Sequence, residues 1–313
     1  MASQNGRDSR PDRPSGAILG GSGARTRDRD AGARTQDGHA SARTPDEDTG
    51  GRTQDGHTGA GGARDGGRPA FYAARPGRWR DWWTLLHPPY TAWHLSYVVI
   101  GACLAPHVYA SRLLASVAAF FLAVGVAAHA LDELHGRPLR TSIPGPALAA
   151  AAAAGLTGAV ALGAAGVAVI GWPGGWVLLP FMVAGPVLVV AYNAELFGGL
   201  VHTDLGFAVA WGAFPALTGY VAQAGNLSLA AVLAAAAALA LSAAQRRQST
   251  PARAIRRRVL RAEGTITFAD GHAIPVSTRL LLDPLERALR AESWAVVLLA
   301  AALATARLSG TIH

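Results

Sequence analysis

Carboxylates are almost absent from the middle of this chain, and no other feature constrains its fold as strongly. The sequence has 20 Asp and Glu residues in 313, yet only four of them lie between Trp82 and Ala262. An ionised side chain at the centre of a bilayer costs about 3 kcal/mol, so membrane segments exclude such groups. Half of the residues are hydrophobic, and the depleted region consists mainly of long apolar runs. These features predict an integral membrane protein.

The apolar runs can be compared with the roughly 20 residues that an α-helix needs to cross the hydrocarbon core. They predict an all-α, polytopic bundle of about seven transmembrane helices, with a six-span membrane domain at 89–245 and a last span within 291–313. The last span has the shortest apolar part, at 294–306. The expected spans are 89–106, 112–131, 147–170, 176–195, 205–224, 227–245 and 291–308.

The N-terminal segment 1–75 is rich in Arg, Asp and Gly and nearly free of large apolar residues. A nine-residue period starts at Gly23, and its units carry an Arg-Thr pair followed by acidic residues, as in Arg34-Thr35-Gln36-Asp37. A binding array is one interpretation, but a low-complexity segment that buries nothing explains the composition more simply. We expect a disordered tail without a signal-peptide core. The following segment, 76–88, mixes Trp with Arg, which is typical of a short helix at the headgroup level.

Arginine sets the expected orientation, because all 28 basic residues are Arg and short cytoplasmic loops are enriched in basic residues. A cytoplasmic N-terminus places Arg78, Arg137, Arg140 and the seven arginines of 246–261 on the cytoplasmic side. It leaves only Arg112 between spans on the opposite face. The absence of Lys, with abundant Ala and Gly, is typical of a high-GC bacterial genome. We therefore expect a multi-pass protein of the inner (plasma) membrane with its N-terminus in the cytoplasm.

The arginines of 246–261 open a basic cytoplasmic loop that we predict at 246–290. We interpret them as a cluster that faces lipid and orients the protein, rather than as a substrate site. The sequence pI near 10.6 does not indicate a nucleic-acid partner, since the excess charge flanks apolar segments. Within the loop, residues 264–276 alternate polar and apolar side chains around an Asp270-Gly271 turn, a pattern that predicts a β-hairpin. Residues 283–290 are expected to form an amphipathic helix that leads into the last span.

The first group of residues suited to chemistry is His129-Ala130-Leu131-Asp132-Glu133-Leu134-His135, at the end of the second span. On a helix, His129 shares a face with Asp132 and Glu133, which follow at i+3 and i+4. Such a group could hold a divalent cation or move a proton, whereas an ordinary charged helix end is the alternative. Asp132 and Glu133 are therefore the candidate catalytic residues.

The second group lies between the fourth and fifth spans, where Gly198-Gly199 breaks the helix and gives a short loop. Glu195, His202 and Asp204 could converge near the mouth of this loop, although their spacing is a weak metal signature. Since both groups are expected on the same membrane face, we predict that they form one cavity mouth. The candidate metal ligands are His129, Asp132, Glu133, Glu195, His202 and Asp204.

Four residues are candidates for substrate binding. Arg137 and Arg140 could bind phosphate through paired hydrogen bonds, although positive-inside anchoring explains them equally well. Asn193, with the neighbouring Tyr192, lies at the end of the fourth span, and His94 lies within the first. Polar side chains at such depths normally line a cavity.

Further motifs accompany these groups. His87-Pro88-Pro89-Tyr90 opens the first span, Gly136-Arg137-Pro138-Leu139 follows the acidic motif, and Trp211-Gly212-Ala213-Phe214-Pro215 and Gly219-Tyr220 lie in the fifth span. Together with Tyr192 to Glu195, they resemble the UbiA superfamily of intramembrane prenyltransferases over roughly residues 85–245. The resemblance implies an all-helical fold with two Asp-rich cytoplasmic loops that hold Mg²⁺ and an isoprenyl diphosphate. It also implies departure of the diphosphate and attack by an acceptor.

The chain departs from the family pattern at both Asp-rich motifs. Where the family has Asn-Asp-x-x-Asp-x-x-x-Asp, this sequence keeps only Asp132 and Glu133 as acids. The second motif is expected after the sixth span, but Gln245-Arg246-Arg247-Gln248-Ser249-Thr250-Pro251 contains no carboxylate.

The leading hypothesis is a divergent UbiA-like membrane protein that transfers a prenyl group from an isoprenyl diphosphate to an acceptor. Its implied cofactor is Mg²⁺, and its implied partner is an isoprenoid or another membrane lipid. One alternative is a non-catalytic protein that binds lipid or a partner. The other is a metal-dependent membrane enzyme of different chemistry that uses His129, Asp132, Glu133, His135, Glu195 and His202.

Overall fold

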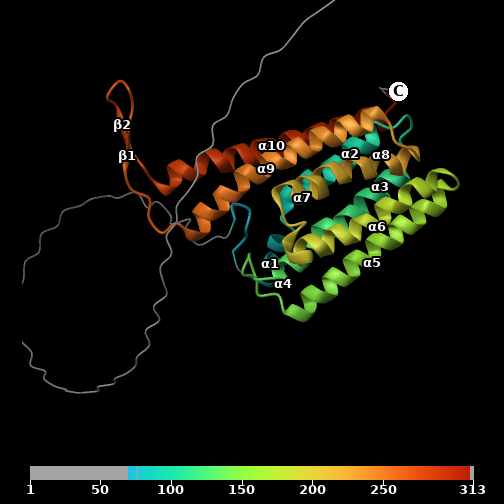
Figure 1. Cartoon of the computed structure of the whole chain (residues 1–313), viewed down its shortest axis with the longest axis horizontal. Helices are drawn as coiled ribbons and strands as arrows, with labels where there is room; N and C mark the ends of the chain where they lie inside the picture. The colour runs from blue at the N-terminus through green and yellow to red at the C-terminus, as the bar shows by residue number, and fades with distance from the viewer. Residues whose placement is uncertain (1–69, 76, 311–313) are drawn as a thin grey trace, which may run out of the picture. The chain divides into compact units, whose positions relative to one another are not determined.

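The computed structural model describes residues 70–75 and 77–310. Within these residues the protein is a bundle of helices with one small β-hairpin (Figure 1). The nine-residue repeats, and the rest of the predicted tail up to residue 69, lie outside the described residues. Six helices in the described part are long and apolar enough to cross a membrane, which identifies a multi-pass membrane protein. They are Ala110–Leu134, Gly145–Ile170, Gly174–Asn193, Asp204–Ala224, Leu229–Arg258 and Thr278–Leu308.

Two of these candidate spans are composite, and each contains a π-helical segment. A π-helix shifts the main-chain hydrogen bonds by one residue, and such segments are frequent at functional sites. The first composite span comprises α3 (Ala110–Phe120), the π-helix η1 (Phe121–Ala128) and α4 (His129–Leu134). The second comprises α7 (Asp204–Ala208), the π-helix η3 (Val209–Ala213) and α8 (Phe214–Ala224). The uninterrupted spans are α5 (Gly145–Ile170), α6 (Gly174–Asn193), α9 (Leu229–Arg258) and α10 (Thr278–Leu308).

Helix α2 (Pro88–Cys103) packs against both α8 and α10 and is shorter than the six candidate spans. Its Trp93 and Tyr97 are almost fully buried, and the Trp93 Nε1–H donates to the Tyr97 hydroxyl. The approach of α2 to α8 depends on Gly219, because a Cβ there would lie 2.1 Å from the carbonyl oxygen of Val98. Small residues at such crossings allow membrane helices to pack closely.

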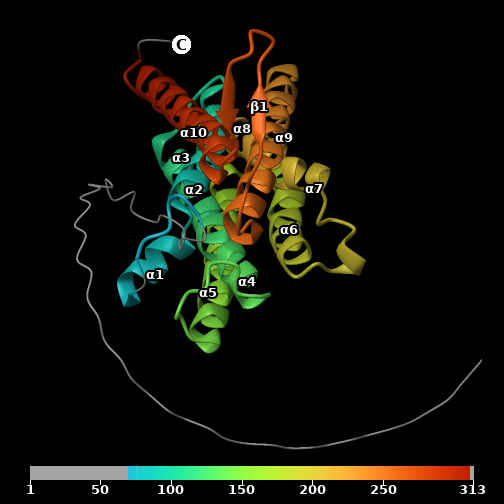
Figure 2. The same ribbon diagram turned by 90° about the vertical axis from the view of Figure 1, so that its left-hand side faces the viewer.

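The C-terminal helices extend further than the sequence predicted. Helix α9 does not end near residue 245 but continues to Arg258. Helix α10 begins at Thr278, so the helix expected at 283–290 and the last span form one continuous helix. Much of the loop predicted at 246–290 is therefore helical. Between the two helices, β1 (Thr265–Thr267) and β2 (Ala273–Pro275) pair antiparallel, with Ile266 opposite Ile274 (Figure 2).

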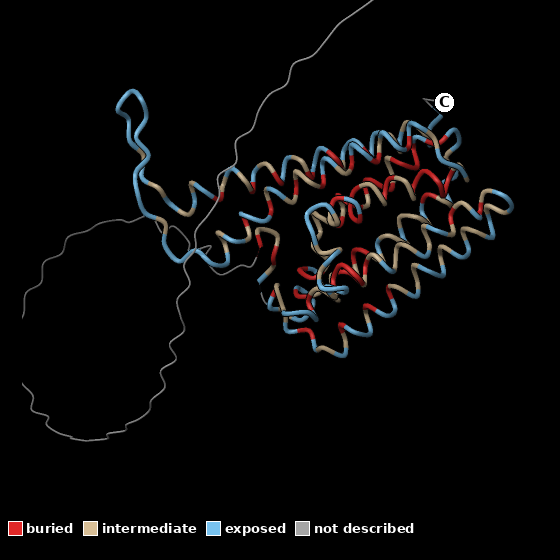
Figure 3. Tube along the Cα trace, viewed as in Figure 1, coloured by how far each residue is buried: buried red, intermediate tan, exposed pale blue. Residues whose placement is uncertain are grey.

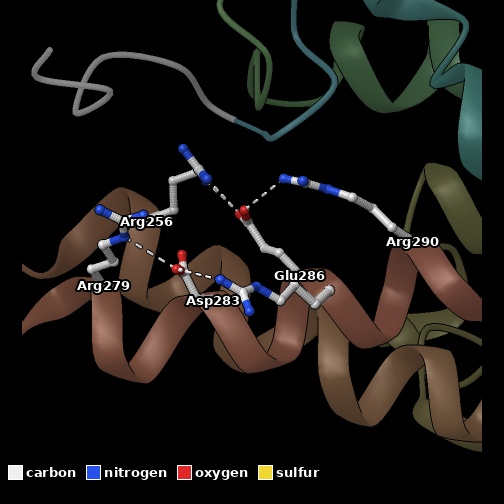
Figure 4. Close-up of polar contacts among 6 residues, drawn as sticks. Arg256, Arg279, Asp283, Glu286 and Arg290 are labelled. Atoms are coloured by element: carbon white, nitrogen blue, oxygen red, sulfur yellow. Dashed lines mark hydrogen bonds and ion pairs between the residues drawn. The ribbon is translucent and has the colours of Figure 1, made fainter.

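Charged side chains join the parts of α9 and α10 that lie nearest the hairpin (Figure 4). Arg256 of α9 donates to one oxygen of the buried Glu286 of α10, from Nε at 2.8 Å and from Nη2 at 2.5 Å. Arg290 Nη2 donates to the other oxygen at 3.4 Å. Because Glu286 is buried with both oxygens engaged, this contact fixes how α9 lies along α10.

Helix α5 contributes little to the interior of the bundle. Of its 26 residues, all described, only Leu148, Ala152 and Gly155 are buried, and most of its trace is intermediate or exposed (Figure 3). In a multi-pass membrane protein, an apolar helix of this kind faces lipid.

Residues 70–75, which the sequence analysis assigned to the tail, pack on the bundle. Ala70 and Ala73 are buried, and the Ala74 N–H donates to Thr84 Oγ1 at 3.0 Å. The guanidinium of Arg290 lies over the ring of Phe71, 5.0 Å from its centroid. The packed part of the chain therefore begins no later than Ala70, because these residues have apolar and aromatic side chains to bury.

Helix α1 (Arg78–Leu85) is joined to the loop after α4 by Asp81. This buried carboxylate accepts the Ser142 N–H at 2.9 Å, the Ser142 hydroxyl and the Gly77 N–H at 3.2 Å. Burial alone raises the pKa of Asp81, but the hydrogen bonds from Ser142 and Gly77 outweigh it, so the pKa lies below its ordinary value.

Candidate functional site

A polar cavity of about 320 Å³ lies where the ends of several helices meet, and its volume is within the range of small-molecule sites. We call it the polar cavity. Its walls come from the segment 70–75, α2, η1, α4, α6, α7, η3 and α9, and from the loops that follow α4 and α6. Its polar lining residues are Tyr72, His87, Tyr90, His94, His129, Asp132, Tyr192, Asn193, His202, Trp211, Gln245, Arg246, Ser249, Arg253 and Arg257.

Three histidines of the polar cavity are oriented in the same way. The Nδ1 atoms of His94, His129 and His202 lie 2.8, 3.1 and 2.9 Å from the main-chain oxygens of Trp211, Gly125 and Tyr192. Since a carbonyl oxygen only accepts, each Nδ1 carries the proton and each Nε2 keeps its lone pair. Each imidazole can therefore accept a proton or bind a cation through Nε2.

The two π-helices explain where two of these histidines are held. The acceptor for His129 is a carbonyl of η1, and the acceptor for His94 is a carbonyl of η3. In both cases an imidazole N–H binds a main-chain oxygen within a segment of altered helical register. The two π-helical segments therefore supply the carbonyl oxygens that hold His94 and His129.

His87 completes the histidine group from the start of α2. Its ring lies 4.1 Å from that of His129, centroid to centroid, and its Nε2 is buried with no hydrogen-bond partner among residues 70–75 and 77–310. Burial, and secondarily the charges of His129, Arg253 and Arg257, lower the pKa of His87 well below its ordinary value. His87 is therefore a neutral side chain at physiological pH.

The two acids of the first motif have different roles. Asp132 lines the polar cavity. Glu133 is fully buried outside it, and its carboxylate accepts the Leu139 N–H at 2.9 Å and both the N–H and hydroxyl of Thr141 at 2.8 Å. The assignment of Glu133 as a catalytic and metal-binding residue is therefore replaced by a structural one, because both of its oxygens hold the loop after α4.

The predicted phosphate ligands Arg137 and Arg140 do not line the polar cavity either. Arg137 Nη1 donates to the carbonyl oxygen of Ile143 at 2.6 Å, and Arg140 is exposed. Both residues have positive φ angles, 53° and 55°, as expected of a tight turn. Arg137 thus stabilises the same loop that Glu133 holds.

The residues of the second motif are also divided between the polar cavity and the exposed surface. Tyr192, Asn193 and His202 line the polar cavity, and the rings of Tyr192 and His202 stack 4.5 Å apart. Glu195 is exposed, and Asp204 is exposed while its Oδ1 accepts Arg246 Nε at 3.0 Å. The structure thus brings His129 and Asp132 together with His202, Tyr192 and Asn193, but places Glu195 and Asp204 outside.

Three arginines of the site were not predicted from the sequence. Arg246, Arg253 and Arg257, interpreted as part of a lipid-facing cluster, line the polar cavity. The available signal was the four-residue spacing of Gln245, Ser249, Arg253 and Arg257, which places these side chains on one helix face. The high arginine content of this segment instead favoured a loop, in which a helical spacing has no meaning.

Within the described part of the chain, three polar atoms of the cavity lining are buried without a hydrogen-bond partner: His87 Nε2, Tyr192 Oη and Gln245 Oε1. Buried polar groups in native proteins are nearly always hydrogen-bonded to protein, water or ligand. Their concentration in one wall therefore marks the cavity as a site for polar groups of a ligand.

An apolar pocket of about 90 Å³ adjoins the polar cavity, and a second apolar pocket adjoins the first. The first, which we call the apolar pocket, shares Val124 and Trp211 with the polar cavity and is otherwise lined mainly by aliphatic and aromatic side chains. The second apolar pocket, of about 280 Å³, shares Phe120, Gly163 and other residues with the first. Both reach the outer surface of the bundle, where their lining residues Val160 and Val169 are 37% and 67% exposed.

The donor set of the polar cavity does not fit the Mg²⁺ site that the resemblance implies. Mg²⁺ takes oxygen ligands in near-octahedral geometry, usually with one or more carboxylates and substrate phosphates. Among the described lining residues, Asp132 alone offers a carboxylate. The described residues also contain no group of three or more His, Cys, Asp or Glu that could hold one metal ion. His135 is exposed and lies outside the lining.

Comparison with known proteins gives no match, whether with family models, curated proteins or solved structures. The assignment of function therefore rests on the residues and the geometry described above.

Proposed function

We propose that this membrane protein binds an isoprenyl diphosphate and transfers its prenyl group to an acceptor, as a divergent UbiA-like prenyltransferase. The observation that carries the proposal is the shared wall of Val124 and Trp211 between a cation-lined polar cavity and an apolar pocket. A ligand that fills both spaces has a charged head and a hydrocarbon chain. An isoprenyl diphosphate has this composition, and the motifs that resemble the UbiA superfamily favour the same ligand class.

The proposed reaction breaks the bond between prenyl C1 and the diphosphate oxygen. A nucleophilic atom of the acceptor forms a bond to C1, the diphosphate leaves with the bond's electron pair, and the acceptor loses a proton. Asp132 or the Nε2 of His129 receives that proton, since both residues line the polar cavity. The guanidinium groups of α9 stabilise the negative charge that develops on the departing diphosphate.

The membrane topology is part of the proposal. Tyr90, near the start of α2, packs against Leu289, and Arg307 Nη2 donates to the carbonyl oxygen of Pro106 just after α2 at 2.7 Å. Helix α2 therefore runs beside the apolar part of α10. On this basis we assign α2 as a seventh transmembrane segment, with the N-terminus and the polar cavity on the cytoplasmic side of the plasma membrane.

The test measures binding of farnesyl diphosphate to the purified full-length protein in detergent. Ala159→Phe on α5 places a ring in the apolar pocket, so we expect the affinity for farnesyl diphosphate to fall about tenfold or more. Ala153→Phe is the matched control, because Ala153 lies on the same helix, is exposed and does not line a pocket. Inorganic diphosphate, which has no chain, should bind both variants equally.

Failure to bind farnesyl diphosphate would contradict the proposed ligand class. Binding without formation of a prenylated product, across phenolic and other aromatic acceptors, would favour the alternative of a lipid-binding protein without catalysis. The observation that favours this alternative is that the described lining residues include only one carboxylate, that of Asp132.

A further inference from the structure

Arginine, rather than acid, dominates the charge of the polar cavity. Its described lining residues include Arg246, Arg253 and Arg257 against the single carboxylate of Asp132. The other carboxylates of the two motifs are outside the lining, with Glu133 engaged by the loop after α4 and Asp204 by Arg246. The cavity is thus built to attract an anion and is poor in the oxygen donors that a divalent metal requires.

Arg253 occupies the central position of the arginine-bearing face of α9. It lies between Ser249 and Arg257 at the four-residue spacing of one helix face. Within the described part of the chain, its guanidinium donates to the hydroxyls of Ser249 and Thr250, each at 3.4 Å. These are long hydrogen bonds to neutral acceptors, which leave most of the five N–H donors of a guanidinium for a ligand.

The neighbouring Arg256 shows the contrast on the same helix. It lies outside the lining of the polar cavity and binds the buried Glu286 of α10, with contacts of 2.8 and 2.5 Å (Figure 4). One face of α9 thus uses arginine to bind a carboxylate within the protein. The adjacent face presents arginine to the cavity.

We infer that the phosphate groups of the ligand are bound directly by Arg253 and Arg257, and that no divalent metal bridges them to the protein. This inference rests on the function proposed above. A guanidinium group binds phosphate oxygens in pairs, at short distance and with full charge. The Tyr192 hydroxyl lines the same cavity, is buried without a hydrogen-bond partner among the described residues, and is a further donor to a phosphate oxygen.

The experiment compares farnesyl diphosphate binding to the purified full-length protein in excess Mg²⁺ and in excess EDTA. We expect the two dissociation constants to agree within about a factor of two. Arg253→Gln should weaken binding about tenfold or more in both conditions, as loss of a charge-assisted contact predicts. Arg258→Gln is the matched control, because it removes the same charge from the same end of α9 at an exposed position outside the lining.

Thermal unfolding of both variants identifies any loss of binding that comes from misfolding, and Arg253→Lys provides a second variant that keeps the charge. Binding abolished by EDTA, or unaffected by Arg253→Gln, would overturn the inference while leaving the proposed function intact. Absence of binding in every condition would instead overturn the proposed function. Competition by phosphatidic acid, but not by inorganic diphosphate, would identify a membrane phospholipid as the source of the phosphate and would also contradict the inference.

Discussion

Glu133 shows how a residue with the chemistry of a catalyst can serve as a structural support. Its carboxylate is fully buried and accepts three hydrogen bonds from the loop after α4, all to Leu139 and Thr141. A charge in such surroundings is tolerated because several donors compensate the loss of water. The neighbouring Asp132, one residue earlier on the helix, lines the polar cavity instead.

We therefore expect Glu133→Gln to destabilise the protein without a direct effect on ligand binding. The amide nitrogen cannot accept a hydrogen bond, so one buried N–H loses its partner at a cost of about 1–3 kcal/mol in the free energy of unfolding. Denaturant unfolding in detergent measures this. Asp204→Asn is the control, since the Asp204 side chain is 75% exposed and should give little change. An unchanged stability of Glu133→Gln would contradict the structural role.

At the scale of elements, the contact of α2 with α8 depends on the absence of a side chain at Gly219. A Cβ there would lie 2.1 Å from the Val98 carbonyl oxygen, a main-chain atom that cannot move without moving α2. We expect Gly219→Ala to lower the melting temperature clearly, since overpacking of this kind costs about 1–3 kcal/mol.

Gly185 of α6 supplies the matched control. A Cβ at this position would lie 3.5 Å from the Phe214 ring, an ordinary van der Waals contact. Gly185→Ala should therefore destabilise the protein less than Gly219→Ala does, because its Cβ meets no main-chain atom of the other described segments and only the following Pro186 disfavours it. If the two variants melted at the same temperature, the close contact of α2 and α8 would not be a determinant of stability.

The elements that could be predicted from the sequence are those whose signal is local. Long apolar runs gave the candidate spans at 112–131, 147–170, 176–195 and 205–224, because exclusion of charge from hydrocarbon acts on each segment separately. The helical extension to Arg258 was not predicted. When hydropathy is the only criterion, an arginine-rich sequence after an apolar run is assigned to a loop. Arginine is in fact a good helix former.

The site was less predictable than the fold, for a physical reason. Histidines and acids mark chemistry in a sequence, and His129, Asp132 and His202 do line the polar cavity. Which acid turns inward depends on the partners that the folded loop offers, as Leu139 and Thr141 do for Glu133. Those partners are set by tertiary contacts, which no spacing rule encodes.

At the scale of the whole molecule, the distribution of arginine predicts which ends of the helices face the cytoplasm. Cysteines at two exposed turns flanking α9 test this, because Cys103 is buried. In intact cells, an impermeant maleimide should label Asn226→Cys, whereas Asp270→Cys should react only after permeabilisation. The reverse pattern would invert the orientation, and labelling of both would show that α9 does not cross the membrane.

The same method tests the seventh span. Trp79 on α1 and His107 after α2 are both exposed, and they lie on opposite sides only if α2 crosses the bilayer. We expect His107→Cys to be labelled in intact cells and Trp79→Cys to be protected. Equal labelling would reduce the number of crossings to the six helices that are long enough by themselves.

The exposure of α5 determines which concentration of a hydrophobic ligand controls occupancy of the site. Its few buried residues leave it at the lipid boundary, and Val160 on its surface also lines the apolar pocket. A hydrocarbon chain that enters there passes from one apolar phase to another without crossing water. Occupancy would then depend on the mole fraction of the ligand among the lipids, so adding inert lipid or detergent at fixed total ligand would dilute the site's supply.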